Sequence, residues 1–582
     1  IKTLGAYVKE FKRASIATPC YMILEVLMEM MIPYLMASII DDGVNKGDMK
    51  HICVVGAGML VIAAIGLFAG IMGGVYGAKA SAGFARNLRK GMYDNIQTFS
   101  FSNIDKFSTA SLVTRLTTDV TNIQNAYQMV LRMCMRAPAS LICAMAMSFF
   151  ISPKLASVYL IAVILLGGVL AIIIRFATKY FNEAFPKYDD LNARVQENVS
   201  AIRVVKAYVR EDHEASTFKK ASGNIYKLLV KAENVVVFNA PAMQFTVYTC
   251  ILLISWLGAK MIVNSSLTTG ELMSLLTYCM NILMSLMMLS MVFVMITMSV
   301  ASARRVSEVL NEKSNLNNPK HPVMEVKDGS ITFDHVTFSY KEDAAEPVLS
   351  DINLSIHSGE TIGILGGTGS SKSSLVNLIS RLYDVNEGSV SVGGIDVRKY
   401  DLDTLRNQVA VVLQKNVLFS GTILDNLRWG DKNATEEECI RACKLACADD
   451  FINTFPDKYN TYIEQGGTNV SGGQKQRLCI ARALLKKPKI LILDDSTSAV
   501  DTATDAKIRK AFAEEIPGTT KLIIAQRISS VQSADRIIVL DEGKINGFGT
   551  HEELLANNAI YRDVYESQTG GGGDFDENGG AQ

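Results

Sequence analysis

The chain has 582 residues, of which 49% are apolar and 20% are charged, and its mean hydropathy is +0.19. Its 58 basic and 58 acidic residues cancel, so the formal net charge is zero. This composition excludes a disordered chain, a collagen-like chain and a small disulfide-stabilised scaffold. It also lacks the strongly basic balance of a nucleic-acid-binding protein, so no nucleic-acid partner is expected.

Long apolar segments dominate the first half of the chain. A helix needs roughly 20 mainly apolar residues to cross a lipid bilayer. The segments that meet this length lie at about residues 16–40, 53–78, 127–150, 154–177, 238–263 and 272–300. Only a tight re-entry, Ser152-Pro153-Lys154, separates the third from the fourth. Six spans exclude a soluble enzyme and predict a multi-pass membrane domain.

The connections between these segments alternate between short and long. The long ones, at 79–126 and 178–237, are polar and carry most of the Lys and Arg residues of this half. Because cytoplasmic loops are enriched in these residues, we expect the long links and both termini to be cytoplasmic. The long links lack Pro and Gly clusters, so the spanning helices are predicted to continue beyond the membrane. Residues 3–13 are expected to form an amphipathic interfacial helix.

Charged residues within membrane spans are candidate functional residues. Glu25 and Glu29 lie four residues apart in the first span and share a helix face, as do Arg132 and Arg136 at the start of the third. They form either the charged wall of a substrate cavity or, alternatively, an ion pair or arginines that reach the interface.

The sixth span is rich in methionine, whose flexible, polarizable side chain suits promiscuous apolar binding. Packing against lipid or other helices is the alternative. The candidate substrate contacts in this span are Met284, Met288, Met291 and Met295.

A phosphate-binding loop opens the second half of the chain. Residues 359–379 are predicted to form an apolar strand, a Gly-rich turn and a helix, after an alternating strand at 329–340. Backbone N–H groups of such a loop hold phosphates, helped by the helix N-terminus. Lys372 is predicted to reach the β- and γ-phosphates and Ser373 a Mg²⁺ ion. The candidate ATP-binding residues of this loop are Gly366, Gly367, Thr368, Gly369, Ser370, Ser371, Lys372, Ser373 and Ser374.

Two further strings complete the nucleotide site. In KILILDDSTSAVD (489–501), a buried strand ends at Asp494, which fits the acid on the Mg²⁺ side of a P-loop ATPase. Between that strand and the loop lies VSGGQKQRLCIARALL (470–485). With its SGGQ signature, which does not belong to other P-loop proteins, the chain resembles the ATP-binding cassette (ABC) transporter family.

The resemblance covers essentially the whole chain and is to an exporter-type half-transporter. It implies an α-helical six-span membrane domain of the exporter type, followed by an α/β P-loop ATP-binding cassette with a helical subdomain. It also implies short coupling helices near 102–108 and 209–216, at the tips of the cytoplasmic links.

Individual positions match the motifs of the family. Tyr340 matches the aromatic residue that stacks on adenine, and Gln414 matches the glutamine that contacts Mg²⁺ and senses the membrane domain. Asp501 matches the aspartate of the D-loop. The signature, which caps the ATP held by the opposite cassette, comprises Ser471, Gly472, Gly473 and Gln474.

Three positions depart from the family pattern. Asp495 replaces the Glu that polarises the attacking water, and its carboxylate is one methylene shorter. Gln526 replaces the switch histidine and carries no titratable proton. Ser371 replaces a Gly, which is tolerable if its φ is negative. Together these changes indicate a site that binds ATP but hydrolyses it poorly.

An intact signature beside a weakened site implies an asymmetric pair. The chain is therefore expected to join a different half-transporter, whose catalytic site this signature completes, as in heterodimeric bacterial multidrug exporters. The expected function is ATP-driven outward movement of amphipathic drugs, lipids or peptides across a bacterial plasma membrane. The alternatives are a regulatory or channel-like ATP-binding subunit and a homodimeric lipid or peptide exporter.

The expected organisation has four parts. They are a transmembrane domain (1–313), a linker (314–324), a nucleotide-binding domain (325–568) and a disordered Gly-rich acidic tail (569–582).

Overall fold

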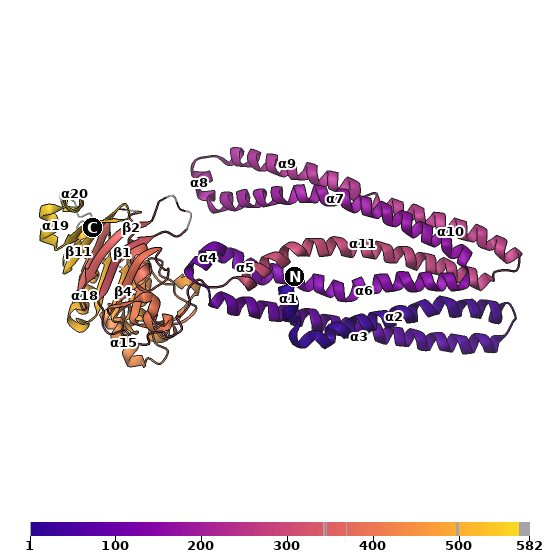
Figure 1. Cartoon of the computed structure of the whole chain (residues 1–582), viewed down its shortest axis with the longest axis horizontal. Coiled ribbons are helices and arrows are strands. Elements are labelled where there is room, and N and C mark those ends of the chain that lie inside the picture. The colour runs from indigo at the N-terminus through magenta and orange to yellow at the C-terminus, as the bar shows by residue number, and fades with distance from the viewer. Residues whose placement is uncertain (1, 342–343, 345, 368, 496–499, 570–582) are drawn as a thin grey trace. The chain divides into compact units, whose positions relative to one another are not determined.

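The computed structural model describes residues 2–341, 344, 346–367, 369–495 and 500–569 (Figure 1). The chain divides into two compact units. The first unit comprises Ile1–Thr98 and Ser108–Glu312. The second unit comprises Phe99–Phe107 and Lys313–Gln582. All but the first residue of the expected tail lies outside the described residues, as does Thr368 of the phosphate loop.

The first unit is helical. Its elements are α1 (Lys2–Gly5), η1 (Ala6–Phe11), α2 (Lys12–Ser38), η2 (Ile39–Val44), α3 (Met49–Gln97), α5 (Thr109–Thr114), η3 (Arg115–Asp119), α6 (Val120–Ile151), α7 (Pro153–Ser200), α8 (Ile202–Ala207), α9 (Glu211–Val236), α10 (Asn239–Val263) and α11 (Thr269–Asn311). Helix α2 packs on α3 and α6, α11 packs along α6, and α7 packs along α9.

The predicted membrane segments are confirmed. Six helical stretches of the described residues are long and apolar enough to cross a membrane. Helices α3 and α7 continue into the long polar links, as predicted. Local signals set their starts: Asp48 caps α3 by accepting the His51 N–H, and Pro153 occupies the first turn of α7 after the extended Ser152.

Two local predictions in this unit are wrong. Residues 3–13 do not form one helix, because Lys9 has φ 41° and ψ −118° and interrupts it. The second expected coupling helix, 209–216, is not a separate short helix: α8 ends at Ala207, Val209 adopts φ 52° in a turn, and residues 211–216 begin α9. A non-glycine residue in the left-handed region breaks helical hydrogen bonding.

The second unit is an α/β domain. Its helices are α4 (Phe101–Phe107), α12 (Lys372–Ile379), η4 (Val397–Lys399), α13 (Leu402–Gln408), α14 (Ile423–Leu427), α15 (Glu436–Leu445), α16 (Asp449–Ile452), η5 (Lys458–Asn460), η6 (Gln465–Gly467), α17 (Gly472–Leu484), α18 (Thr502–Glu515), η7 (Ile528–Ser530), α19 (His551–Asn557) and α20 (Ala559–Thr569). Its strands are β1 (Ile331–Phe338), β2 (Leu349–Ile356), β3 (Thr361–Gly366), β4 (Glu387–Val392), β5 (Ile395–Asp396), β6 (Val409–Val412), β7 (Gly421–Thr422), β8 (Tyr462–Ile463), β9 (Ile490–Asp494), β10 (Thr520–Ile524), β11 (Arg536–Asp541) and β12 (Lys544–Gly549).

A six-stranded sheet in the order β12-β11-β3-β10-β9-β6 forms the centre of this unit, and all neighbours except β11 and β12 are parallel. Its strands are apolar on both faces. Ile490 and Ile492 of β9 join one core with the antiparallel sheet β2-β1-β4-β5, while Leu491 and Leu493 join another with α15 and α17. The carboxyl ends of β3 and β9 therefore lie at one edge, where ligands of such sheets bind.

Candidate functional site

A cavity of about 540 Å³ lies at this edge. The glycine-rich loop after β3, the end of β9 and the segment after β10 contribute to it. Its lining comprises Leu365, Gly366, Gly367, Gly369, Ser371, Lys372, Ser373, Ser374, Gln414, Asp494, Asp495, Ile524, Gln526 and Val564. The predicted phosphate loop, the magnesium-side acid and all three departures from the family pattern thus line one cavity.

The loop fits a phosphate group. A Cβ atom on Gly367 or Gly369 would meet nothing within 4 Å, so the backbone there faces open space. Lys372 donates to the carbonyl oxygens of Gly366 and Gly367 at 2.9 and 2.8 Å, which holds its ammonium against the loop. Burial lowers the pKa of Lys372, an effect that the charges of the two neighbouring aspartates oppose.

Ser371 lies at φ 71° and ψ 22°, immediately before α12, and its side chain makes no capping hydrogen bond. The negative φ under which Ser would be tolerated is therefore not found. The turn from loop to helix requires the left-handed conformation, which costs a non-glycine residue about 1–2 kcal/mol.

We predict that Ser371→Gly stabilises the nucleotide-free protein by about 0.5–1 kcal/mol, because relief of the left-handed strain exceeds the added entropy of the unfolded chain. Thermal unfolding in detergent measures this. Ser370→Gly is the matched control: this serine has no positive φ and accepts a hydrogen bond from Lys372 at 3.2 Å, so its loss destabilises. An equal effect of the two substitutions would contradict the assignment of strain to residue 371.

The acidic side of the cavity offers oxygen atoms suited to Mg²⁺. Asp494 is 6% exposed at the end of β9 and accepts a hydrogen bond from Ser373. Gln414 donates a hydrogen bond to Asp495. Mg²⁺ prefers hydroxyl, amide and carboxylate oxygens, so Ser373, Gln414 and Asp494 fit the ion that accompanies ATP.

Burial raises the pKa of Asp494, and the nearby Asp495 carboxylate raises it further. Such a group stabilises the fold only when protonated. Its contribution is present below the unfolded pKa of about 4 and is lost as pH rises through the higher folded pKa.

We therefore predict that Asp494→Asn raises the melting temperature of the nucleotide-free protein at pH 7 by about 2–4 °C, on the order of 1 kcal/mol, while weakening Mg·ATP binding. The gain over wild type disappears near pH 4. Asp541→Asn, at the exposed end of β11, is the control and leaves the melting temperature unchanged. A gain that persists near pH 4 would show that charge burial is not its cause.

The two unusual residues contact each other. Gln526 Nε2 donates to Asp495 Oδ2 at 3.4 Å, and the Asp495 backbone adopts φ 47°. Asp is among the few non-glycine residues that enter this region readily. The Asp495 carboxylate accepts hydrogen bonds from the side-chain amides of both Gln414 and Gln526.

The C-terminal helix also reaches the cavity, which no motif indicates. Val564 of α20 lines it. Gln568 donates through Nε2 to the carbonyl of Gln526 at 2.9 Å and accepts the Ile528 N–H at 2.8 Å. The Gln568 side chain thus forms hydrogen bonds with the backbone of both Gln526 and Ile528.

The predicted adenine-stacking residue lies beside the cavity and near α4. Tyr340 is 46% exposed, and its hydroxyl shares a hydrogen bond of 2.8 Å with Ser374. The Tyr383 ring lies 5.1 Å from the Tyr340 ring and 6.0 Å from that of Phe101. Tyr383 also donates to Asp105 Oδ2 at 2.7 Å. Tyr383 therefore contacts both Tyr340 and helix α4, which is the first predicted coupling helix.

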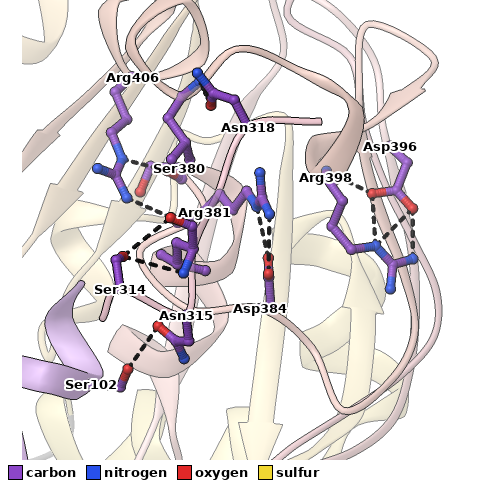
Figure 2. Close-up of polar contacts among 12 residues, drawn as sticks. Ser102, Ser314, Asn315, Asn318, Ser380, Arg381, Asp384, Asp396, Arg398 and Arg406 are labelled. Carbon is purple, nitrogen blue, oxygen red and sulfur yellow. Dashed lines mark hydrogen bonds and ion pairs between the residues drawn. The ribbon is translucent and has the colours of Figure 1, made fainter. Parts of the chain in front are cut away.

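Polar contacts also join α4 to the start of the α/β domain. Figure 2 shows Ser102 beside Asn315, to which it donates at 3.1 Å. Close by, the buried Arg381 pairs with Asp384 at 2.8 Å, and Arg406 donates to the Arg381 carbonyl at 2.8 Å.

The signature lies apart from this cavity. Ser471 caps α17 and forms a capping box with Gln474, and Ser471 and Gly472 are exposed. Asp501 is also exposed and caps α18 through the Thr504 N–H. Among the described residues, neither motif lines the phosphate-loop cavity.

Charged residues in the membrane unit form an ion cluster. Arg136 on α6 pairs with Glu25 at 2.6 Å and with Glu29 at 2.9 Å, both on α2. This is the ion pair considered as the alternative to a charged cavity wall. Arg132 packs its stem near Gly77 and has no hydrogen-bond or ion-pair partner in the described part of the chain.

The methionines on α11 differ in exposure. Met284 and Met291 are 57% and 65% exposed, whereas Met288 and Met295 are half-buried.

The fold and site define a membrane-embedded P-loop ATPase. Residues 16–287 match the family model for the ABC transporter transmembrane region, and residues 349–498 match the model for the ABC transporter. An uncharacterized ABC transporter ATP-binding protein of Bacillus subtilis, YfiB, is 38% identical over 549 residues, which cover 94% of this chain and 95% of the relative. The chain belongs to the ABC transporter family, as an exporter-type half-transporter.

Two further similarities describe its relatives. The ATP-dependent lipid A-core flippase of Desulfotalea psychrophila is 34% identical over 488 residues, covering 83% of this chain and 84% of the flippase. The structure of a bacterial Atm1-family ABC exporter with ATP bound superposes with a TM-score of 0.81 over 96% of this chain and 99% of the other, at 24% identity. This second similarity shows the exporter fold.

Proposed function

We propose that the chain is the degenerate-site subunit of a heterodimeric ABC exporter. Its own site holds Mg·ATP with slow hydrolysis, and its signature completes the catalytic site of a partner half-transporter. The cargo is an amphipathic drug, lipid or peptide moved outward across a bacterial plasma membrane, with both termini and the nucleotide-binding domain in the cytoplasm.

The observation that carries this proposal is the contact between Asp495 and Gln526, two of the three departures from the family pattern. A general base must have a free carboxylate oxygen aimed at the attacking water. The Asp495 side chain is one methylene shorter than Glu, and its carboxylate is held by hydrogen bonds from the amides of Gln414 and Gln526. Because a displacement of about 1 Å can cost a hundredfold in rate, this arrangement supports nucleotide binding more than hydrolysis.

The signature supports the second half of the proposal. Ser471 and Gly472 are exposed, and the capping box with Gln474 keeps the start of α17 ordered. A helix N-terminus with exposed N–H groups and a serine hydroxyl suits the phosphates of a second ATP. If the partner were a second copy of this chain, the signature would complete only another weak site. An intact signature therefore contributes to hydrolysis only when the partner is a different half-transporter with a competent site.

The cargo class rests on the membrane unit and one relative. Arg136 pairs with both Glu25 and Glu29 and neutralises half of their acidic charge, so this region is polar and carries a small acidic excess. The exposed methionines of α11 add a soft apolar surface. Similarity to a lipid flippase favours an amphipathic molecule with a long apolar part.

Copurification tests the pairing. The chain is tagged, expressed with its chromosomal neighbours, extracted gently, and the copurifying proteins are identified and quantified. We expect a second ABC half-transporter at a one-to-one ratio. A self-dimer with robust ATPase activity would overturn the proposal, because Asp495 and Gln526 would then suffice for catalysis.

A further inference from the structure

A second cavity lies toward the amino ends of β3 and β10, whereas the phosphate-loop cavity lies at the carboxyl ends of the strands. Its volume is about 320 Å³. Thr361 at the start of β3, Lys521 near the start of β10 and Ala534 before β11 line it, together with residues of α18. It shares no lining residue with the phosphate-loop cavity.

A lysine in the middle of the sheet contributes to this cavity. Lys521 is 4% exposed and pairs in register with Thr361 of β3 and Leu491 of β9. Lysine is almost never buried so fully unless it is paired. In the described part of the chain its ammonium has no hydrogen bond or ion pair, and the neighbouring Asp535 carboxylate accepts the Thr361 N–H at 2.7 Å.

Arg509 of α18 supplies a second unsatisfied cationic donor. Its Nη1 donates to Ser533 Oγ at 3.1 Å and its Nη2 pairs with Asp505 at 3.2 Å. Its Nε is buried and has no partner among the described residues. Asp505 also accepts the Ser530 hydroxyl at 3.2 Å, so the cavity adjoins the end of the segment that carries Gln526.

We propose that this cavity binds a small phosphate-bearing anion. Lys521 and Arg509 each leave cationic N–H groups that need an acceptor, and leaving such donors buried without one is costly. The hydroxyl groups of Thr361 and Ser533 on the same wall add neutral donors. A phosphate group accepts from several directions at once and forms strong charge-assisted hydrogen bonds. The volume lies at the lower end of small-molecule sites.

The experiment measures thermal unfolding of the full chain in detergent as phosphate is raised at constant ionic strength. Lys372→Ala is present throughout to remove phosphate binding at the nucleotide loop. We expect the melting temperature to rise by about 2–4 °C at tenfold excess over the dissociation constant. Lys521→Met keeps the apolar stem, removes the charge and should lower the affinity at least tenfold. Lys544→Met, at an exposed position, is the matched control and should keep the full rise.

A second variant and a second ligand sharpen the result. Arg509→Lys keeps a cation beside Asp505 but lacks the Nε donor, so it should weaken binding severalfold while the protein still folds. Inorganic phosphate and glycerol 3-phosphate are titrated separately, which distinguishes a free ion from a phosphorylated metabolite. A rise with either ligand that depends on Lys521 supports the proposal. No rise with either, or an equal rise in Lys521→Met, overturns it.

Discussion

Ser471→Ala in the assembled transporter is expected to lower steady-state ATP hydrolysis by about 100-fold. The hydroxyl lies on the exposed signature at the start of α17. Removal of one preorganised donor to a transition-state oxygen costs about 100- to 1,000-fold in rate. In the proposed asymmetric pair, this signature serves the site that performs nearly all hydrolysis, so the loss falls on total turnover. Phosphate release by the purified complex measures it.

The control for this variant must separate catalysis from helix capping. Ser471 forms a capping box with Gln474, whose loss alone costs about 1 kcal/mol of stability. Thr435 forms the same kind of box with Glu438 at the start of α15. Thr435→Ala should therefore reduce stability by a similar amount and leave ATP hydrolysis within twofold of wild type.

A companion variant shows which site is catalytic. Lys372→Ala removes the ammonium from the phosphate loop of this chain, and in the asymmetric pair it should lower hydrolysis less than tenfold. In a homodimer, every site contains both the signature and the phosphate loop, so the two variants would lower hydrolysis alike. Equal losses would therefore contradict the proposed heterodimer.

Local patterns in the sequence predicted the elements that form the glycine-rich loop and its flanks. An apolar strand, a glycine-rich turn and a helix over 359–379 became β3, the loop and α12, because each obeys short-range rules. The same holds for the six membrane segments, since burial in a bilayer leaves a long apolar run. In both cases the structure can be predicted from residues that are close together in the sequence.

Contacts between distant residues were not predictable in this way. Gln568 reaches the segment around Gln526 only because α20 packs against η7, which follows that segment. The left-handed φ of Ser371 and of Val209 depends on how the chain must turn, which residue type alone does not reveal. Pairing of Arg136 with both Glu25 and Glu29 required the relative rotation of α2 and α6, and uniformly apolar helix faces give no such information.

Restoring the family residues at positions 495 and 526 should increase hydrolysis at this chain's own site. In a complex that already carries Ser471→Ala, the partner's site is nearly silent, so the remaining turnover comes from the phosphate loop of this chain. We expect Asp495→Glu with Gln526→His to raise that turnover by about 100-fold, because the longer carboxylate regains its reach and no longer accepts from Gln526. Single-turnover hydrolysis of ATP bound to this site measures the change.

The backbone at residue 495 limits what the single substitution can do. Its φ of 47° suits Asp better than Glu, so Asp495→Glu alone should gain less than the double variant and lower the melting temperature slightly. Asp495→Asn with Gln526→His is the matched control, since it has the histidine but no carboxylate, and it should show no gain. If the fully restored site remains as slow as this control, the cause of slow hydrolysis lies outside these two residues, with Ser371 and the hold of Gln568 on the switch segment as the next positions to change.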